Sequence, residues 1–152
     1  MRQLLITGGC GFIGANLIRY LLEQSPFEGR VINLDKLTYA GNPESVADLA
    51  ERFPGRYVFV PADRGDPAAM AEVFDRYGVD SLCHLAAESH VDRSIVAPEA
   101  FVQTNLVGTF TLLEAARARR ERLVRFHHVS TDEVYGSLGE EGRFQEATPY
   151  RP

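Results

Sequence analysis

The sequence has few cysteines, no long apolar run and no excess of positive charge, and each absence excludes a class of protein. Only Cys10 and Cys83 occur among 152 residues, so neither a disulfide framework nor a metal site is expected. No apolar segment reaches membrane-spanning length, and the N-terminus lacks a signal-peptide pattern. The net charge of −5 argues against a nucleic-acid surface. We therefore expect a cytoplasmic protein that binds neither membranes nor nucleic acid.

What the chain does contain is an alternation of strand and helix patterns. The predicted strands are Gln3–Thr7, Arg30–Leu34, Tyr57–Val60, Ser81–Ala86 and Val124–Ser130. The predicted helices are Phe12–Gln24, Pro43–Arg52, Pro67–Tyr77 and Pro98–Arg120. The strands are continuous apolar runs, which is typical of a parallel sheet covered on both faces. The sequence thus predicts one α/β domain with a doubly wound parallel sheet. Glu140 and Glu141 are expected to face solvent in a late loop.

Three glycines follow the first strand with the spacing Gly8-x-x-Gly11-x-x-Gly14, and they open the first helix. About twenty residues later the second strand ends at Asp35, which completes the pattern of a Rossmann dinucleotide-binding unit. Gly8 permits a sharp turn, Gly11 lets a pyrophosphate approach the backbone, and Gly14 allows close helix packing. The free N–H groups at the start of the helix would face the phosphates.

Asp35 favours NAD over NADP as the dinucleotide. Its carboxylate can accept hydrogen bonds from both ribose hydroxyls and would repel a 2′-phosphate. Lys36 follows directly and could instead recruit a phosphate, so this preference is open at the level of sequence. A glycine-rich turn that binds no ligand is the simpler alternative.

Further polar residues follow the later strands, where ligands bind in such sheets. They are Asp63 and Arg64, the segment Leu85–His90, Thr104 and Asn105, and the segment Thr131–Glu133. Asp132 and Glu133 are candidates for an acid and a base, because burial and a neighbouring like charge can raise the pKa of a carboxyl group. Alternatively, Ser130–Asp132 forms only a turn or a helix cap. His84, His127 and His128 lie within predicted strands and are expected to be structural.

Four stretches resemble the extended short-chain dehydrogenase/reductase superfamily and, within it, the dTDP-glucose 4,6-dehydratases. These are Thr7–Gly14, Leu34–Asn42, His84–Ser94 and His127–Gly136. Together with the glycine pattern, the resemblance implies an NAD site made by Gly8, Gly11, Phe12, Ile13, Gly14, Asp35, Lys36, Leu37, Thr38, Asp63, Arg64, Leu85, Ala86, Ala87, Glu88, Ser89 and Thr104.

The resemblance also implies a reaction, the dehydration of dTDP-glucose to dTDP-4-keto-6-deoxyglucose. NAD would take a hydride from sugar C4, water would leave across C5–C6, and the hydride would return to C6. By matching position, Asp132 would protonate the departing C6 hydroxyl and Glu133 would remove the C5 proton. Thr131 would hydrogen-bond the sugar near C4, and Ser89 would contact substrate or cofactor. The alternatives are another NAD-dependent nucleotide-sugar epimerase or decarboxylase, and a non-catalytic NAD-binding module.

The sequence departs from this family at one essential point. Relatives oxidise C4 with a Tyr-x-x-x-Lys pair, but Lys36 is the sole lysine and no tyrosine precedes it by four residues. We therefore expect residues 1–152 to be the front part of a longer protein. They would form an NAD-binding domain truncated after the fifth strand, with the substrate domain absent. Such a chain is expected to be inactive by itself, whereas the full-length protein is expected to be a homodimer.

Overall fold

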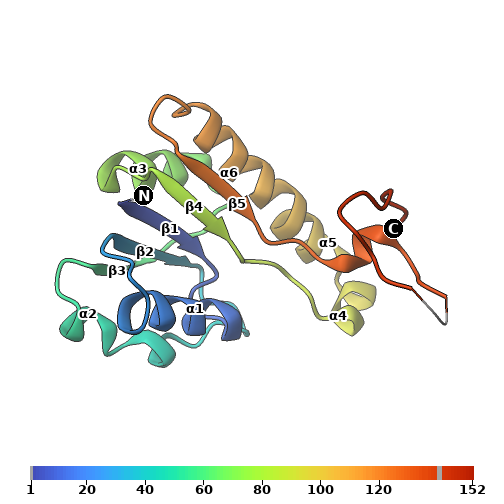
Figure 1. Ribbon diagram of the computed structural model, residues 1–152, viewed down its shortest axis with the longest axis horizontal. Coiled ribbons are helices and arrows are strands. Elements are labelled where there is room, and N and C mark those ends of the chain that lie inside the picture. Colours follow the sequence, from blue (N-terminus) through green and yellow to red (C-terminus); the bar gives the residue numbers. More distant parts are fainter. Residues whose placement is uncertain (1, 140–141) are drawn as a thin grey trace.

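The computed structural model describes residues 2–139 and 142–152, so Glu140 and Glu141 lie outside the described residues. A parallel sheet with the strand order β3-β2-β1-β4-β5 forms its centre (Figure 1). The strands are β1 Gln3–Thr7, β2 Arg30–Asp35, β3 Tyr57–Pro61, β4 Ser81–His84 and β5 Arg125–His128. The α-helices are α1 Phe12–Glu23, α2 Leu49–Arg52, α3 Pro67–Tyr77, α4 Val91–Val96, α5 Pro98–Phe101 and α6 Gly108–Arg117. The predicted doubly wound α/β fold is confirmed.

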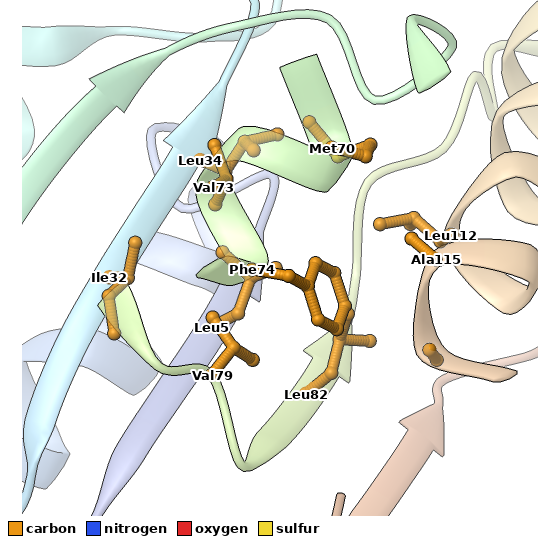
Figure 2. Close-up of a cluster of buried hydrophobic side chains, with 11 residues drawn as sticks. Leu5, Ile32, Leu34, Met70, Val73, Phe74, Val79, Leu82, Leu112 and Ala115 are labelled. Carbon is orange, nitrogen blue, oxygen red and sulfur yellow. The ribbon is translucent and has the colours of Figure 1, made fainter. Parts of the chain in front are cut away.

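Apolar side chains cover both faces of the sheet at β1 and β2, as the continuous apolar strands predict, whereas most of the edge strand β5 is exposed. On one face, Leu5 and Leu82 pack with Phe74 of α3 and Leu112 of α6 (Figure 2). On the other face, Leu4, Ile6 and Val31 pack with α1 and α2 through residues such as Ile18 and Leu49. Successive residues of a strand therefore contribute to the cores on opposite faces of the sheet, because strand side chains alternate between faces. The sheet is held from both sides, which fixes the positions of the strand ends.

The sequence defines both ends of α3. The Asp66 side chain accepts hydrogen bonds from the backbone N–H groups of Ala68 at 2.8 Å and Ala69 at 3.2 Å. Pro67 occupies the first helical position, where its missing N–H costs nothing. Gly78 ends the helix with φ of +60°, and its N–H donates to the carbonyls of Asp75 and Phe74.

Two predicted strands are shorter in the structure than the apolar runs suggest. Strand β4 ends at His84 rather than Ala86, because the N–H groups of Leu85 and Ala86 donate to the Thr7 hydroxyl instead of continuing the ladder. Strand β5 pairs only with the four residues of β4, so it spans Arg125–His128 and not Val124–Ser130.

Two predicted helices are divided. In place of one helix over Pro43–Arg52, the structure has a 3-10 helix, η1 Pro43–Val46, followed by the short α2. In place of one helix over Pro98–Arg120, a π-helical segment, η2 Val102–Val107, separates α5 from α6. Two elements were not predicted, namely α4 and a 3-10 helix, η3 Asp132–Tyr135.

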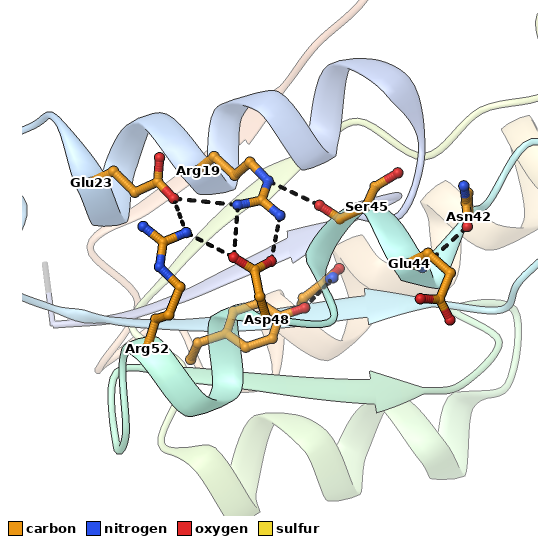
Figure 3. A network of polar contacts seen from close by, with 9 residues as sticks. Arg19, Glu23, Asn42, Glu44, Ser45, Asp48 and Arg52 are labelled. Carbon is orange, nitrogen blue, oxygen red and sulfur yellow. Dashed lines mark hydrogen bonds and ion pairs between the residues drawn. The ribbon is translucent and has the colours of Figure 1, made fainter.

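A cluster of charges fastens α1 to the segment that contains η1 and α2 (Figure 3). Arg19 of α1 forms a two-point ion pair with Asp48 and donates to the Ser45 carbonyl at 3.0 Å. Arg52 joins the cluster through Asp48 at 2.7 Å and Glu23 at 2.6 Å. Hydrogen bonds from Arg19 and Arg52 hold the pKa of Asp48 well below its usual range. These partly exposed pairs orient the segment rather than stabilise the fold strongly.

The helix formed by η2 and α6 carries apolar side chains on an exposed face. Val102, Leu106, Phe110 and Leu113, here termed the α6 stripe, recur every three or four residues and are 48–67% exposed. This spacing places them along one side of the helix, whereas Leu112, next to Leu113 in the sequence, is fully buried in the core. None of the described helices is both long and apolar enough to cross a membrane.

We predict that Phe74→Ala lowers the free energy of unfolding by about 3–5 kcal/mol, because it leaves a cavity where a fully buried ring fills the core. Urea unfolding followed by circular dichroism measures the change. Phe110→Ala is the matched control, since Phe110 is 62% exposed and its loss should cost no more than about 0.5 kcal/mol. Equal effects of the two variants would contradict the assignment of the core.

Candidate cofactor-binding site

A cleft of about 330 Å³ opens at the carboxyl ends of β1, β2 and β4. It is lined by Gly8, Gly11, Phe12, Ile13, Gly14, Leu34, Asp35, Lys36, Thr38, Ala40, Gly41, Ala62, Arg64, Leu85, Ala86, Ala87, Glu88, Ser89 and Thr104. Every residue predicted for the cofactor site, apart from Leu37 and Asp63, lies in this lining. The sheet order explains the grouping, because β1 lies between β2 and β4 and parallel strands end at the same edge.

Close backbone contacts require glycine in the turn between β1 and α1. Gly8 has φ of +74°, and a Cβ there would lie 2.8 Å from the Ala86 Cα. A Cβ on Gly14 would lie 2.2 Å from the Gly8 carbonyl oxygen, so this glycine lets α1 approach the turn itself. Among the described residues, a Cβ on Gly11 would meet the Gly8 carbonyl oxygen alone, at 3.3 Å, which leaves the Gly11 backbone open to the cleft.

The N-terminus of α1 gives the cleft a positive electrostatic potential. Gly11 precedes the helix without a side-chain cap, and no acidic residue lies in the first turn. The first N–H groups of a helix lack partners within it, and the helix dipole adds positive potential there. Twelve helical residues contribute to that dipole. The arrangement suits an anionic ligand.

Asp35 is held in place by the backbone on both sides. One carboxylate oxygen accepts the N–H of Cys10 at 2.9 Å, and the other accepts the N–H of Leu37 at 2.8 Å. The side chain is buried at the cleft wall. Each oxygen has further acceptor capacity. Asp35 can therefore receive two hydroxyl donors without moving.

Leu37 and Asp63 were predicted for the cofactor site but have other contacts. Leu37 has φ of +56°, and its N–H is the group that donates to Asp35. Asp63 lies outside the cleft lining, accepts the N–H of Gly65 at 2.8 Å and pairs with Lys36 at 3.5 Å. That ion pair draws the Lys36 ammonium toward Asp63, which reduces its availability for a phosphate.

Thr7 and His84 connect the ends of β1 and β4 beneath the cleft. The Thr7 hydroxyl accepts the N–H groups of Leu85 at 3.3 Å and Ala86 at 3.2 Å. Its proton must then be donated to His84 Nδ1, which lies 2.6 Å away. His84 Nε2 therefore carries the ring proton and donates to the Thr109 hydroxyl at 3.0 Å. Burial, with the charges of Arg64 and His128, lowers the pKa of His84 to about 3.

The π-helical segment η2 supports two walls of the cleft. Arg64, which is buried, donates from Nη2 to the Thr104 carbonyl at 2.8 Å. Its Nε has no hydrogen-bond partner among residues 2–139 and 142–152. Asn105 binds the Glu88 backbone at two points, accepting its N–H at 2.9 Å and donating to its carbonyl at 2.8 Å. The π-helical turn thus places the Thr104 carbonyl against the segment that follows β3 and the Asn105 side chain against the segment that follows β4.

No sequence pattern indicates the role of Gly9. A Cβ there would lie 2.0 Å from Asn33 Oδ1, so the buried Asn33 requires glycine at this position. Asn33 donates to the Tyr57 hydroxyl at 2.9 Å and lies 3.7 Å from the Cys10 sulfur. Burial and the charge of Asp35 raise the pKa of the Cys10 thiol to about 11. The cleft lining also includes four residues that were not predicted, namely Leu34, Ala40, Gly41 and Ala62. The first three lie within the resembling stretch Leu34–Asn42, whereas Ala62 lies in none of the four stretches.

The predicted catalytic residues lie apart from the cleft lining. Thr131, Asp132 and Glu133 are exposed at the start of η3, so the expected burial of the two carboxylates is absent from the described chain. The Thr131 hydroxyl accepts the N–H of Glu133 at 3.3 Å, as in the helix-cap alternative. Ser89, predicted to contact substrate or cofactor, lines the cleft.

We predict that His84 stays neutral and protonated on Nε2 between pH 5 and 8, which ¹⁵N NMR of the ring can establish. The unfolded state binds a proton near pH 6.5 whereas the folded state does not. The free energy of unfolding should therefore fall by up to about 1.4 kcal/mol per pH unit as the pH drops from 6.5 to 5. This pH dependence of the free energy of unfolding should be absent in the His84→Gln variant. Titration of His84 near pH 6.5 in the folded chain would contradict the assignment.

The comparisons with known proteins agree with this geometry. The dTDP-glucose 4,6-dehydratase of Neisseria meningitidis is 49% identical over the full chain. The chain spans 44% of that protein's length. The structure of the dTDP-glucose 4,6-dehydratase of Streptomyces venezuelae, with NAD and TYD bound, matches 99% of the chain and 45% of its own, with 44% identity and a TM-score of 0.87.

The fold itself is shared more widely than the sequence. The UDP-glucose 4-epimerase of Thermus thermophilus in complex with NAD has a TM-score of 0.81 over 99% of the chain and 44% of its own, but only 29% identity. The family model for GDP-mannose 4,6 dehydratase matches residues 5–152. The chain therefore belongs to the GDP-mannose 4,6-dehydratase family.

Proposed function

We propose that residues 1–152 form the NAD-binding part of a longer enzyme that converts dTDP-glucose to dTDP-4-keto-6-deoxyglucose. The observation that carries this proposal is the cleft, which brings the glycine turn, the start of α1 and Asp35 together in a chain so similar to known dehydratases. The substrate domain of this enzyme would lie in the remainder of the longer protein.

The residues of the cleft fit NAD. The space beside Gly11 leaves room for a pyrophosphate against the backbone, and the first turn of α1 offers N–H donors to it. Asp35 would accept hydrogen bonds from the adenine ribose, with Lys36 held by Asp63. When bound, NAD supplies an acceptor and then a donor of hydride. The protein residues orient it and exclude the 2′-phosphate of NADP.

The acid and base of the elimination would be Asp132 and Glu133. Asp132 would protonate the departing C6 hydroxyl, and Glu133 would remove the C5 proton. Such a pair needs two environments, one that keeps a carboxyl protonated and one that keeps its neighbour ionised. Both groups face solvent on this chain. We therefore propose that the remainder of the enzyme and the bound sugar enclose them.

Thr131 would bind the sugar, and Ser89 would contact the sugar or the cofactor. The Thr131 hydroxyl uses an acceptor lone pair for the Glu133 N–H, so its own proton is free to donate near sugar C4.

The Tyr-x-x-x-Lys pair required for C4 oxidation does not occur in this sequence, in which Lys36 is the sole lysine. We therefore propose that the chain by itself binds cofactor without turnover.

An NAD-dependent nucleotide-sugar epimerase or decarboxylase is the second candidate, and the shared fold of the epimerase supports it. The adjacent carboxylates Asp132 and Glu133 favour the dehydratase, because an epimerase does not eliminate water. A non-catalytic NAD-binding module would need the cleft alone.

For the full-length protein we also propose a homodimer, supported by the α6 stripe, whose exposed apolar side chains would be covered by a second helix surface.

We predict that NAD⁺ binds the chain at least about tenfold more tightly than NADP⁺, and that Asp35→Ala weakens NAD⁺ binding by about 10- to 100-fold and reduces this selectivity. Isothermal titration calorimetry measures both affinities. Glu72→Ala is the charge-matched control, because Glu72 is an exposed carboxylate on α3. Equal losses in the two variants, or no NAD⁺ binding at all, would refute the proposed cofactor site.

We predict that Asp132→Asn combined with Glu133→Gln in the full-length enzyme slows water loss and C5 proton exchange by at least about 10²-fold, since each substitution removes a group that transfers a proton. Product formation from dTDP-glucose and solvent deuterium incorporation at C5 measure the two steps. The unaltered 152-residue chain should show no turnover in the same assay. Near-normal elimination by the double variant would refute the assigned roles.

A further inference from the structure

A side-chain hydrogen bond joins the two loops that flank the cleft. The Tyr39 hydroxyl donates to Glu88 Oε2 at 3.1 Å, and these residues are 49 positions apart in the sequence. Tyr39 follows β2, Glu88 follows β4, and β1 lies between those strands. The bond therefore crosses the carboxyl end of β1, where the glycine turn begins.

Arg93 adds a second contact to this bridge. The centre of its guanidinium lies 3.8 Å from the centroid of the Tyr39 ring, a short cation–π distance. Partial burial and the Glu88 carboxylate raise the pKa of Tyr39 above its ordinary value, so its hydroxyl remains a donor at neutral pH. Arg93 belongs to α4, so three segments of the chain meet at one aromatic ring.

Both ends of the bridge are anchored through the backbone. The turn that presents Tyr39 is closed by the Gly41 N–H, which donates to the Thr38 carbonyl at 3.0 Å. The next N–H, of Asn42, donates to the Cys10 carbonyl at 2.8 Å. At the other end, Asn105 holds the Glu88 backbone at two points. Because both loops are anchored, a bond between them restrains how far they separate.

The neighbours of the bridging residues line the cleft from opposite sides. Thr38, Ala40 and Gly41 contribute to one wall, and Ala87, Glu88 and Ser89 contribute to the other. We propose that Tyr39, Glu88 and Arg93 form a strap that closes over the dinucleotide and limits both its binding and its release. This inference rests on the proposed function of the cleft as an NAD site.

The proposed reaction gives such a strap a use. A hydride taken from sugar C4 is returned to C6 of the same sugar, so release of the reduced dinucleotide between the two transfers would strand an oxidised sugar. A strap that joins the two loops restrains the entry of the dinucleotide as well as its exit. Its removal should raise the association and dissociation rates together, whereas loss of a direct ligand contact raises the dissociation rate alone.

Stopped-flow fluorescence of NADH with the purified chain separates these possibilities. Tyr39→Phe removes the hydroxyl that donates to Glu88 and keeps the ring. We expect this variant to raise both rate constants by about fivefold and to change the dissociation constant less than about twofold. Tyr20→Phe on α1, another largely exposed tyrosine, should match the unaltered chain.

Each other outcome identifies which idea fails. Unchanged rates in Tyr39→Phe would overturn the strap while NADH binding itself upholds the cofactor site. An increase in the dissociation rate alone would make Tyr39 a ligand contact and would also overturn the strap. Failure of the unaltered chain to bind NADH would refute the proposed function and the strap with it.

Hydrogen exchange provides a readout that needs no ligand. In the free Tyr39→Phe chain, we expect amide exchange to accelerate by about fivefold at both Thr38–Gly41 and Ala87–Ser89, because the two loops lose their common restraint. The Tyr20→Phe chain should show the exchange of the unaltered protein. Equal exchange in the Tyr39→Phe and unaltered chains would overturn the strap.

Discussion

The close approach of the backbone at Gly8 to the backbone at Ala86 determines how the rest of the cleft is built. A Cβ at Gly8 would lie 2.8 Å from the Ala86 Cα, so no other residue fits without moving one of the two strands. Thr7, directly before Gly8, binds the N–H groups of Leu85 and Ala86 and thereby ends β4. His84 then orients the Thr7 hydroxyl from below. The close contact just beyond the ends of β1 and β4 is thus coupled to the glycine turn, the length of β4 and the state of a buried histidine.

The parts of this arrangement that depend on consecutive residues could be predicted from the sequence. The glycine turn, the helix after it and Asp35 form one continuous strand–helix–strand unit, and its spacing is visible in the chain. Contacts between distant residues could not be predicted in this way. Gly9 is required by the side chain of Asn33, and the long helix predicted from Pro98 is interrupted by η2, where the Thr104 carbonyl accepts a hydrogen bond from Arg64. Local propensity contains no information about either partner.

Asp132 and Glu133, which follow β5, show a second limit to what can be predicted from the sequence. The order of residues places Asp132 next to Glu133 and places both after a strand, and the structure has them there at the start of η3. Their environment depends on which other segments surround them, and on the described chain they face solvent. Identity and position can therefore be inferred from the sequence, whereas the polarity of the surroundings depends on packing. Asp35 and Arg64 of the cleft differ, because this chain by itself buries both side chains.

The position of Cys10 has a consequence for the resistance of the protein to oxidants. A thiol within a ligand-binding turn would ordinarily be exposed to peroxide and electrophiles, which react with the thiolate form. With a pKa of about 11, only about one molecule in ten thousand carries the Cys10 thiolate at neutral pH, and the sulfur is buried beside Asn33. The same burial that packs the turn against the sheet therefore protects it from sulfenic acid formation, so the cleft should keep its shape under oxidative stress.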